Sequence, residues 1–159
     1  MPSDQGRWPV REGPIDCAYS DDGVRVVLDG SPRTVRAALA VTLGALAPLR
    51  LSRDTIQSLE LVLAEVMNNI VEHAYADVPS GRIELRVDLR NGALSCQTLD
   101  DGAPLPRGLL PDPPPPEPAD APQGGFGWLL IKSLVSDLDY VRAGRRNRLR
   151  FRLPVVQAA

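Results

Sequence analysis

LAEVMNNIVEHAY, residues 63–75, is the stretch on which the prediction of the fold depends. It continues a run that follows Ser52, a residue whose side chain can cap a helix, and it carries apolar residues at helical spacing. The apolar stripe of the whole run consists of Ile56, Leu59, Leu63, Val66 and Ile70. We therefore predict an amphipathic helix from Arg53 to about Tyr75, with this stripe buried.

A second stripe on the same helix is polar and consists of Glu65, Asn69 and His73. Steps of four residues turn a helix by about 400°, so these side chains lie almost in line beside the apolar stripe. One interpretation is the solvated flank of an amphipathic helix. The other is a carboxylate that orients or deprotonates an attacking hydroxyl, beside an amide oxygen that binds Mg²⁺. For His73, a structural hydrogen-bonding role is the alternative to ligand binding.

The other elements follow in the order strand, two helices, hairpin, long loop, helix and hairpin. Asn91-Gly92 is a strong hairpin signal, and Ser31-Pro32 is typical of a helix start. The predicted elements are a strand from Val24, a helix from Pro32 to about Pro48, strands at 82–90 and 93–99, a helix at 126–136, and strands at 139–142 and 148–154. They predict an α+β fold, a two-layer α/β sandwich whose antiparallel or mixed sheet carries the helices on one face.

Two proline-containing segments are predicted to lie outside the regular secondary structure. Residues 1–14 are predicted to form a flexible N-terminal tail, and 15–159 a single domain of ordinary size. Residues 101–124 contain nine prolines, a density at which neither helix nor central strand propagates. The residues that follow are too few for a core of their own. We therefore predict a lid at about 103–123 inside the domain rather than a linker between domains.

Composition excludes several classes of protein. The formal net charge of −2 argues against a general nucleic-acid-binding surface. Two distant cysteines and a single histidine argue against a zinc site or a disulfide framework. The longest apolar stretch, residues 37–49, is too short to cross a bilayer, and the N-terminal segment lacks the apolar core that a signal peptide needs. The sequence therefore predicts a cytoplasmic protein with no direct nucleic-acid or membrane contact.

Two further motifs flank the predicted lid. Asp100-Asp101-Gly102 ends a predicted strand, where an inward carboxylate can accept a hydrogen bond from an exocyclic amine and glycine leaves room for a ring. A simple turn is the alternative. The glycine-rich segment 123–127 (QGGFG) opens the next helix, where backbone amides favour phosphate, although it can equally be a flexible loop.

Taken together, these motifs resemble the Bergerat-type ATP site of the GHKL superfamily. Glu65 and Asn69 are similar to its N box, Asp100 and Gly102 to its first glycine box, and Gly125 and Gly127 to its second. Within that superfamily, AEVMNNIVEHAY, GGFGWLLIKSLVSDLDYVR and NRLRFRLP most resemble the bacterial anti-sigma-factor serine kinases of the RsbW and SpoIIAB type. The resemblance covers roughly residues 22–156.

The resemblance implies a role for each matching residue. Glu65 would be the general base or orienter, and Asn69 would bind Mg²⁺. The remaining candidates for contact with ATP are His73, Asp100, Gly102, Gly125, Phe126 and Gly127. The implied activity is Mg²⁺- and ATP-dependent phosphorylation of a serine on a STAS-domain anti-anti-sigma protein. The implied second partner is a sigma factor or another regulator that the kinase sequesters, and a homodimer is possible in such a family.

One departure from the family pattern keeps an alternative open. Gln123 stands where some members carry a basic residue, and Arg107 is the only cation of the predicted lid. Arg107, Lys132 or an arginine of a partner would then have to neutralise the transition state. A non-catalytic module, in which nucleotide gates protein binding, is therefore the alternative to a kinase. Asn147, near the position of the superfamily's last adenine-side motif, is either part of the site or a turn residue.

Overall fold

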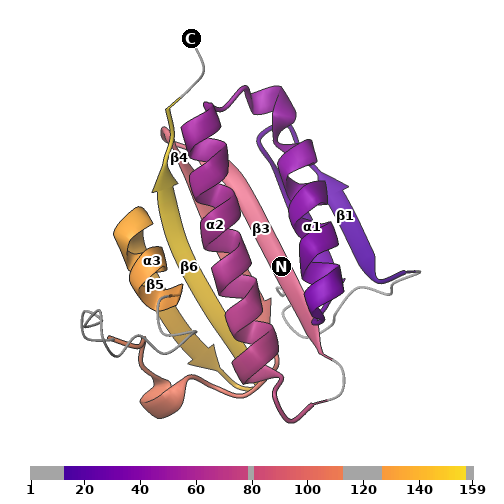
Figure 1. Ribbon diagram of the computed structural model, residues 1–159, viewed down its shortest axis with the longest axis vertical. Helices are drawn as coiled ribbons and strands as arrows, with labels where there is room; N and C mark the ends of the chain where they lie inside the picture. Colours follow the sequence, from indigo (N-terminus) through magenta and orange to yellow (C-terminus); the bar gives the residue numbers. More distant parts are fainter. Residues whose placement is uncertain (1–12, 79–80, 113–126, 157–159) are drawn as a thin grey trace, which may run out of the picture.

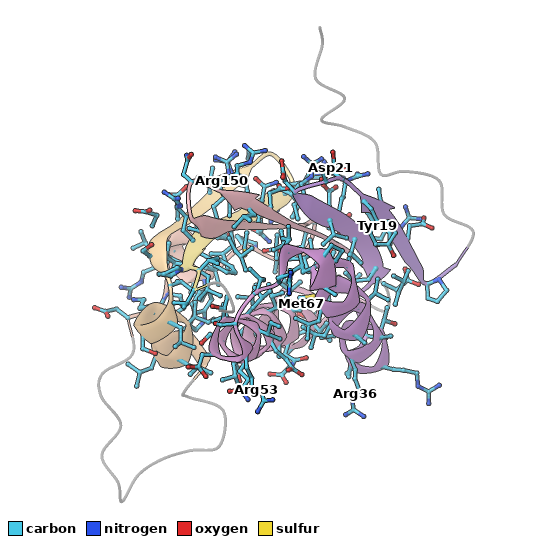
Figure 2. The ribbon with its side chains drawn as sticks, turned by 90° about the horizontal axis from the view of Figure 1, so that it is seen from above. Tyr19, Asp21, Arg36, Arg53, Met67 and Arg150 are labelled. Carbon is cyan, nitrogen blue, oxygen red and sulfur yellow. The ribbon has the colours of Figure 1, made fainter. Side chains whose placement is uncertain are left out.

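The structure is a computed structural model, and it describes residues 13–78, 81–112 and 127–156. Within these residues, six strands form one sheet in the order β1-β2-β3-β4-β6-β5, and every neighbouring pair is antiparallel. The strands are β1 (Ile15–Tyr19), β2 (Gly23–Asp29), β3 (Arg82–Arg90), β4 (Ala93–Asp100), β5 (Ser136–Ala143) and β6 (Arg146–Pro154). The helices α1 (Pro32–Ala45), α2 (Arg53–Asn69) and α3 (Gly127–Leu134) cover one face of the sheet (Figure 1; Figure 2). The predicted two-layer α+β sandwich is confirmed, and its sheet is antiparallel rather than mixed.

Both long helices begin where their caps predict. The Ser31 hydroxyl accepts a hydrogen bond from the Thr34 amide at 3.2 Å, and Ser52 does the same for Thr55 at 3.1 Å. The α1 helix ends at Ala45, and a short 3₁₀ turn, Ala47–Leu49, contains the proline that prevents its continuation.

The end of α2 differs from the prediction of one uniform helix to Tyr75. After Asn69 the chain continues as a π-helical turn, Ile70–Ala74, and the Tyr75 amide donates to the Ile70 carbonyl five residues back. This wider turn changes the angular step per residue. The position of His73 therefore no longer follows from the α-helical repeat that aligns Glu65 with Asn69.

The N-terminal strand was not predicted. The β1 strand pairs with β2 along its whole length, although the polar residues around Tyr19 give its sequence no clear alternation. Of the predicted tail, residues 1–12 lie outside the described residues, as do 113–123 of the predicted lid. Near the C-terminus, α3 stops at Leu134 and β5 begins at Ser136, earlier than the predicted helix end and strand start. The pairing of β5 with β6 shifts register between Ser136 and Asp139, where Asp137 has a φ of 55°.

The core lies between the sheet and the helices, and the alternation of two neighbouring strands positions the site. Leu94 and Cys96 of β4 point into the core, so the next inward residues are Thr98 and Asp100. On β6, the inward residue paired with Asp100 is Asn147. The apolar rows of both strands thus end in polar side chains at the same end of the sheet, beside the C-terminal half of α2.

Candidate nucleotide-binding site

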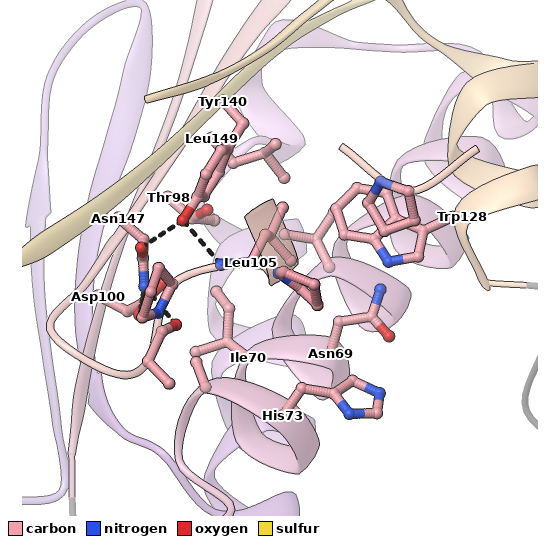
Figure 3. A pocket seen from close by; sticks show the side chains of 16 residues that line it. Asn69, Ile70, His73, Thr98, Asp100, Leu105, Trp128, Tyr140, Asn147 and Leu149 are labelled. Carbon is pink, nitrogen blue, oxygen red and sulfur yellow. Dashed lines mark hydrogen bonds between the residues drawn. The ribbon is translucent and has the colours of Figure 1, made fainter. Parts of the chain in front are cut away.

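A cavity of about 350 Å³ lies at this end of the sheet. Its walls come from the end of α2, from β4 and β6, from the segment 103–111, and from Trp128 at the start of α3 (Figure 3). Most of the lining is apolar and includes Ile70, Leu105 and Leu149, whereas the polar groups are few. Such a cavity can hold a flat ring system and orient it through a small number of hydrogen bonds.

Asp100 is the buried acid of the cavity, with 4% of its surface exposed. Its Oδ1 accepts hydrogen bonds from Asn147 Nδ2 at 2.8 Å and from the Gly102 amide at 3.0 Å. Within the described part of the chain, Oδ2 accepts no hydrogen bond, so it remains available to a donor in the cavity. Burial raises the pKa of Asp100 to about 6, because the charged form loses solvation.

Asn147 lies on β6 and is buried, so it is not the turn residue that the sequence left as an alternative. Its Nδ2 donates to Asp100 and to the Ala103 carbonyl at 2.9 Å, and its Oδ1 accepts from the Tyr140 hydroxyl at 2.6 Å (Figure 3). Tyr140 in turn accepts a hydrogen bond from the Leu105 amide at 3.0 Å. The Asn147 amide is thus fully used in joining the segment after β4 to β5 and β6.

Arg142 of β5 adds a cation to this network. Its Nη1 donates to the Gly102 carbonyl at 2.6 Å and to Asn147 Oδ1 at 3.0 Å. The chain just after Asp100 is therefore held from two strands before the proline-rich segment begins. Sequence reasoning missed Tyr140 and Arg142. Both belong to β5, and neither is part of a recognisable motif.

Gly102 has a structural reason to be glycine. A Cβ at this position would lie 2.5 Å from the carbonyl oxygen of Ala74, at the end of the π turn, and the next amide, that of Ala103, donates to the same oxygen at 2.8 Å. The close approach is therefore to backbone rather than to open space. That Gly102 also admits a base ring remains a prediction.

Thr98 is a polar residue of the cavity that sequence reasoning did not single out. Its side chain is 1% exposed, and its Oγ1 has no hydrogen-bond partner among the described residues. A buried hydroxyl without a partner is costly, so this one indicates a polar group or a water in the cavity. The signal was available in the sequence, because Thr98 lies two residues before Asp100 and shares its face of the strand.

Glu65 and Asn69 lie together next to the start of α3. A Cβ added to Gly127 would be 2.7 Å from Glu65 Oε2 and 3.7 Å from Asn69 Nδ2. The structure therefore brings these two residues of the predicted N box against one residue of the second glycine box. Asn69 also lines the cavity, and its buried Nδ2 has no partner within the described ranges.

The remaining predicted residues are placed less centrally. His73 is exposed at the rim of the cavity, and no hydrogen bond joins its ring to another described residue (Figure 3). Gly125 and Phe126 lie outside the described residues. Arg107 is exposed on a short turn, and Lys132 pairs with the exposed Asp112 at 3.4 Å. Neither cation lines the cavity.

The groups present fit a magnesium nucleotide. Asp100 offers an acceptor at one end of the cavity, and Asn69 an amide at the other. No cluster of three or more His, Cys, Asp or Glu that could hold a metal occurs in the described part of the chain. A single amide oxygen agrees with Mg²⁺, which is commonly held by one or two protein ligands together with waters and substrate phosphates.

Comparisons with known proteins identify the family of the chain. Residues 28–153 match the histidine kinase-like ATPase domain family. The chain is 25% identical over 122 residues to the serine-protein kinase RsbW of Oceanobacillus iheyensis, covering 74% of this chain and 77% of that protein. It is 28% identical over 109 residues to the blue-light-activated histidine kinase 2 of Erythrobacter litoralis, covering 65% of this chain but only 29% of that protein.

A solved structure shares the fold. The RsbU and RsbW domains of Rv1364c from Mycobacterium tuberculosis align with 85% of this chain at a TM-score of 0.59 and 18% identity. This chain spans 33% of that structure's length. Within the described residues, no helix is both long and apolar enough to cross a membrane. Because the family match extends over most of the sequence and the cavity lies inside it, this chain belongs to the histidine kinase-like ATPase domain family.

Proposed function

We propose that this chain is a Mg²⁺- and ATP-dependent serine-protein kinase of the RsbW kind. One observation carries the proposal: Glu65 and Asn69 of α2 meet Gly127, which is distant in sequence, beside a cavity that has Asp100 at its other end. One relative, with 77% of its length matched, is itself named a serine-protein kinase. The domain would comprise residues 15–159, with residues 103–123 as its lid.

The base of ATP would lie in the apolar part of the cavity. Asp100 Oδ2 would accept a hydrogen bond from the exocyclic amine, because both hydrogen bonds from the chain already go to Oδ1. The Thr98 hydroxyl would bind a ring nitrogen directly or through a water. Carboxylate and hydroxyl would together orient the ring, while Ile70 and Leu149 would cover its faces.

The phosphates would lie toward Asn69 and the start of α3. Magnesium, when bound, supplies charge neutralisation on the phosphates, and Asn69 is the residue that would hold it. Backbone amides around Gly125, Phe126 and Gly127 would contact the phosphates, and His73 at the rim would contact the outermost part of the ligand. Glu65 would orient the serine hydroxyl of the protein substrate and accept its proton.

The protein substrate would be a STAS-domain anti-anti-sigma protein, and the sequestered partner a sigma factor or another regulator. Such a switch works in the cytoplasm without direct contact with DNA or a membrane, and a homodimer is compatible with it. These partners are proposed from the serine-protein kinase relative and from the anti-sigma-kinase features of the sequence.

The test is phosphoryl transfer from radiolabelled ATP to candidate STAS-domain proteins of the same genome. We expect a labelled serine, and we expect Glu65→Gln to slow labelling by at least about 100-fold while nucleotide binding persists. Glu60→Gln, which changes an exposed glutamate of the same helix, is the matched control and should leave the rate unchanged. ATP binding without any phosphoprotein would favour the nucleotide-gated module instead. Labelling that survives Glu65→Gln would remove Glu65 from its proposed role.

A further inference from the structure

The face of the sheet that points away from the helices is rich in arginine. In β6, whose sequence is RNRLRFRLP, the apolar residues point into the core and the arginines point outward. Figure 2 shows Arg150 on this outer face, and Arg36 and Arg53 on the helical layer at the opposite side of the molecule. We use the name arginine face for the outward side chains Arg86, Arg90, Arg148, Arg150 and Arg152.

Strand register brings these side chains into one continuous area. Gln97 of β4 is paired with Arg86 on one side and with Arg150 on the other, so the three form a row across β3, β4 and β6. Ser95 is paired with Arg152 in the next row. Because neighbouring strands lie about 4.8 Å apart, the arginines are close enough for one partner surface to contact several of them.

Of these five arginines, only Arg86 forms an ion pair with an acid among the described residues. Arg150 Nε donates to the neutral Gln97 Oε1 at 2.9 Å, and Arg152 Nη2 donates to the Arg90 carbonyl at 3.3 Å. Arg148 Nε is buried and has no hydrogen-bond partner within the described ranges.

The acids on this face do not neutralise it. Glu84 forms ion pairs with Arg25 at 3.0 Å and with Arg86 at 2.8 Å, so its charge is already shared. Asp139 is opposite Arg150 in the register, yet no ion pair joins them. Asp88 is also on this face of β3. A local excess of positive charge therefore exists on a chain whose net charge is −2.

We propose that the arginine face docks the acidic surface of a partner protein. Arginine forks bind carboxylates in a bidentate manner, and a flat sheet offers several of them to a folded surface at once. A second copy of this chain would place arginines against arginines, which costs free energy. A single-stranded nucleic acid would find no aromatic residue on the described part of this face on which its bases could stack.

The experiment uses the full chain and fluorescence anisotropy with a labelled poly-L-glutamate peptide as the acidic probe. The variant Arg150→Glu/Arg152→Glu should weaken binding by at least about tenfold, since each change removes an attraction and adds a repulsion. Arg36→Glu/Arg53→Glu, with the same charge change on exposed helical positions, is the matched control and should leave binding within about twofold. Binding by the unaltered chain should weaken as salt is raised.

Four results would overturn the proposal. They are no binding of poly-L-glutamate, an equal loss in both double variants, tighter binding of a single-stranded RNA of the same charge, and a dimer in sedimentation that Arg150→Glu/Arg152→Glu abolishes. Asp100→Asn should not affect the peptide, which keeps this surface distinct from the nucleotide site. If circular dichroism shows that the charge-reversed variant does not fold, the neutral Arg150→Gln/Arg152→Gln variant must also weaken binding, by a smaller factor.

Discussion

The two ends of the cavity differ in how far the protein itself satisfies their polar groups. At the end formed by β4 and β6, Asn147 uses both atoms of its amide within the chain, and Asp100 Oδ1 accepts from two donors. At the end formed by α2 and α3, the Asn69 amide nitrogen is buried without a partner in the described residues. At the first end the chain's own hydrogen bonds fix the network and leave only Asp100 Oδ2 and the Thr98 hydroxyl for a ligand, whereas at the second end no such bond fixes the Asn69 amide nitrogen.

This difference teaches how the site divides its work. A base is recognised by a few fixed hydrogen bonds, and fixing them in advance lowers the entropy cost of binding. Phosphoryl transfer depends on groups that reach their final positions around a metal and a second substrate. Changes at the β4 and β6 end should therefore act on affinity, and changes at the α2 and α3 end on the rate of transfer.

The largest expected effect is that of Gly127→Ala on the rate. The new methyl group would lie 2.7 Å from Glu65 Oε2, so the carboxylate must move away from its position. We expect phosphoryl transfer to fall by about 100-fold, as a misplacement of about 1 Å at a reacting group commonly does, with little change in ATP affinity. Rate and affinity are measured separately, by single-turnover labelling and by calorimetry. An equal loss of transfer rate and of ATP affinity would contradict the assignment of rate to one end of the cavity and of affinity to the other.

Asp100→Asn tests the other end. Loss of the charged acceptor should weaken ATP binding by about 30-fold, which corresponds to about 2 kcal/mol. The same change removes a buried charge that is costly to desolvate, so the free energy of unfolding at neutral pH should rise by about 2 kcal/mol. Thermal melts and calorimetry measure the two quantities. Asp77→Asn, at an exposed carboxylate, should alter neither, and a less stable Asp100→Asn would contradict this account.

The pH dependence of adenosine binding also tests Asp100 as the acceptor for the base. Adenosine is the suitable ligand because it carries no titrating phosphate. The pKa of Asp100 is raised to about 6 by burial, so the acceptor is ionised at neutral pH and protonated in acid. Affinity should be constant above about pH 7 and fall by about tenfold toward pH 5. An affinity unchanged across this range would separate Asp100 from base recognition.

Stability should change with pH in the opposite direction. The folded pKa lies above the ordinary value of 3.8, so the contribution of Asp100 to the free energy of unfolding is largest in acid and is lost as the pH rises from about 4 to about 6. Above that window the loss is complete. Asp100→Asn should remove this part of the pH profile, which chemical denaturation at a series of pH values would detect.

The smallest expected effect belongs to Tyr140→Phe. The hydroxyl joins Asn147 to the Leu105 amide, so its loss leaves both groups without that partner. We expect a destabilisation of about 1 kcal/mol and an affinity for ATP lower by about fivefold, with no separate effect on the transfer step. Tyr19→Phe, at a tyrosine that is 68% exposed, is the control and should change neither quantity.

Much of the fold could be predicted because its signals are local. Helix caps at Ser31 and Ser52 and the Asn91-Gly92 turn act through neighbouring residues, and the structure places them as predicted. The β1 strand could not be predicted in this way, because pairing with β2 rather than its own alternation stabilises it. The π turn after Asn69 also has no local signal, since its geometry accompanies a tertiary contact between Ala74 and the segment after Asp100.

The residues of the site also fall into those that the sequence predicts and those that it does not. Five residues could be predicted from their spacing, and the structure places them at or beside the two ends of one cavity, although their roles remain predictions: Glu65, Asn69, Asp100, Gly102 and Gly127. The residues that support them, Tyr140 and Arg142, were not found. They act across strands through register, which a single sequence does not reveal.

The pairing of β4 with β6 has one more consequence. Asp100 belongs to the hairpin of β3 and β4, whereas Asn147 belongs to the hairpin of β5 and β6. The base-binding end therefore lies across the contact between two hairpins, each of which pairs residues that are close in sequence. A nucleotide bound to both hairpins would stabilise their contact. Its binding should therefore protect the amide hydrogens of β6 from exchange with solvent, even far from the ligand.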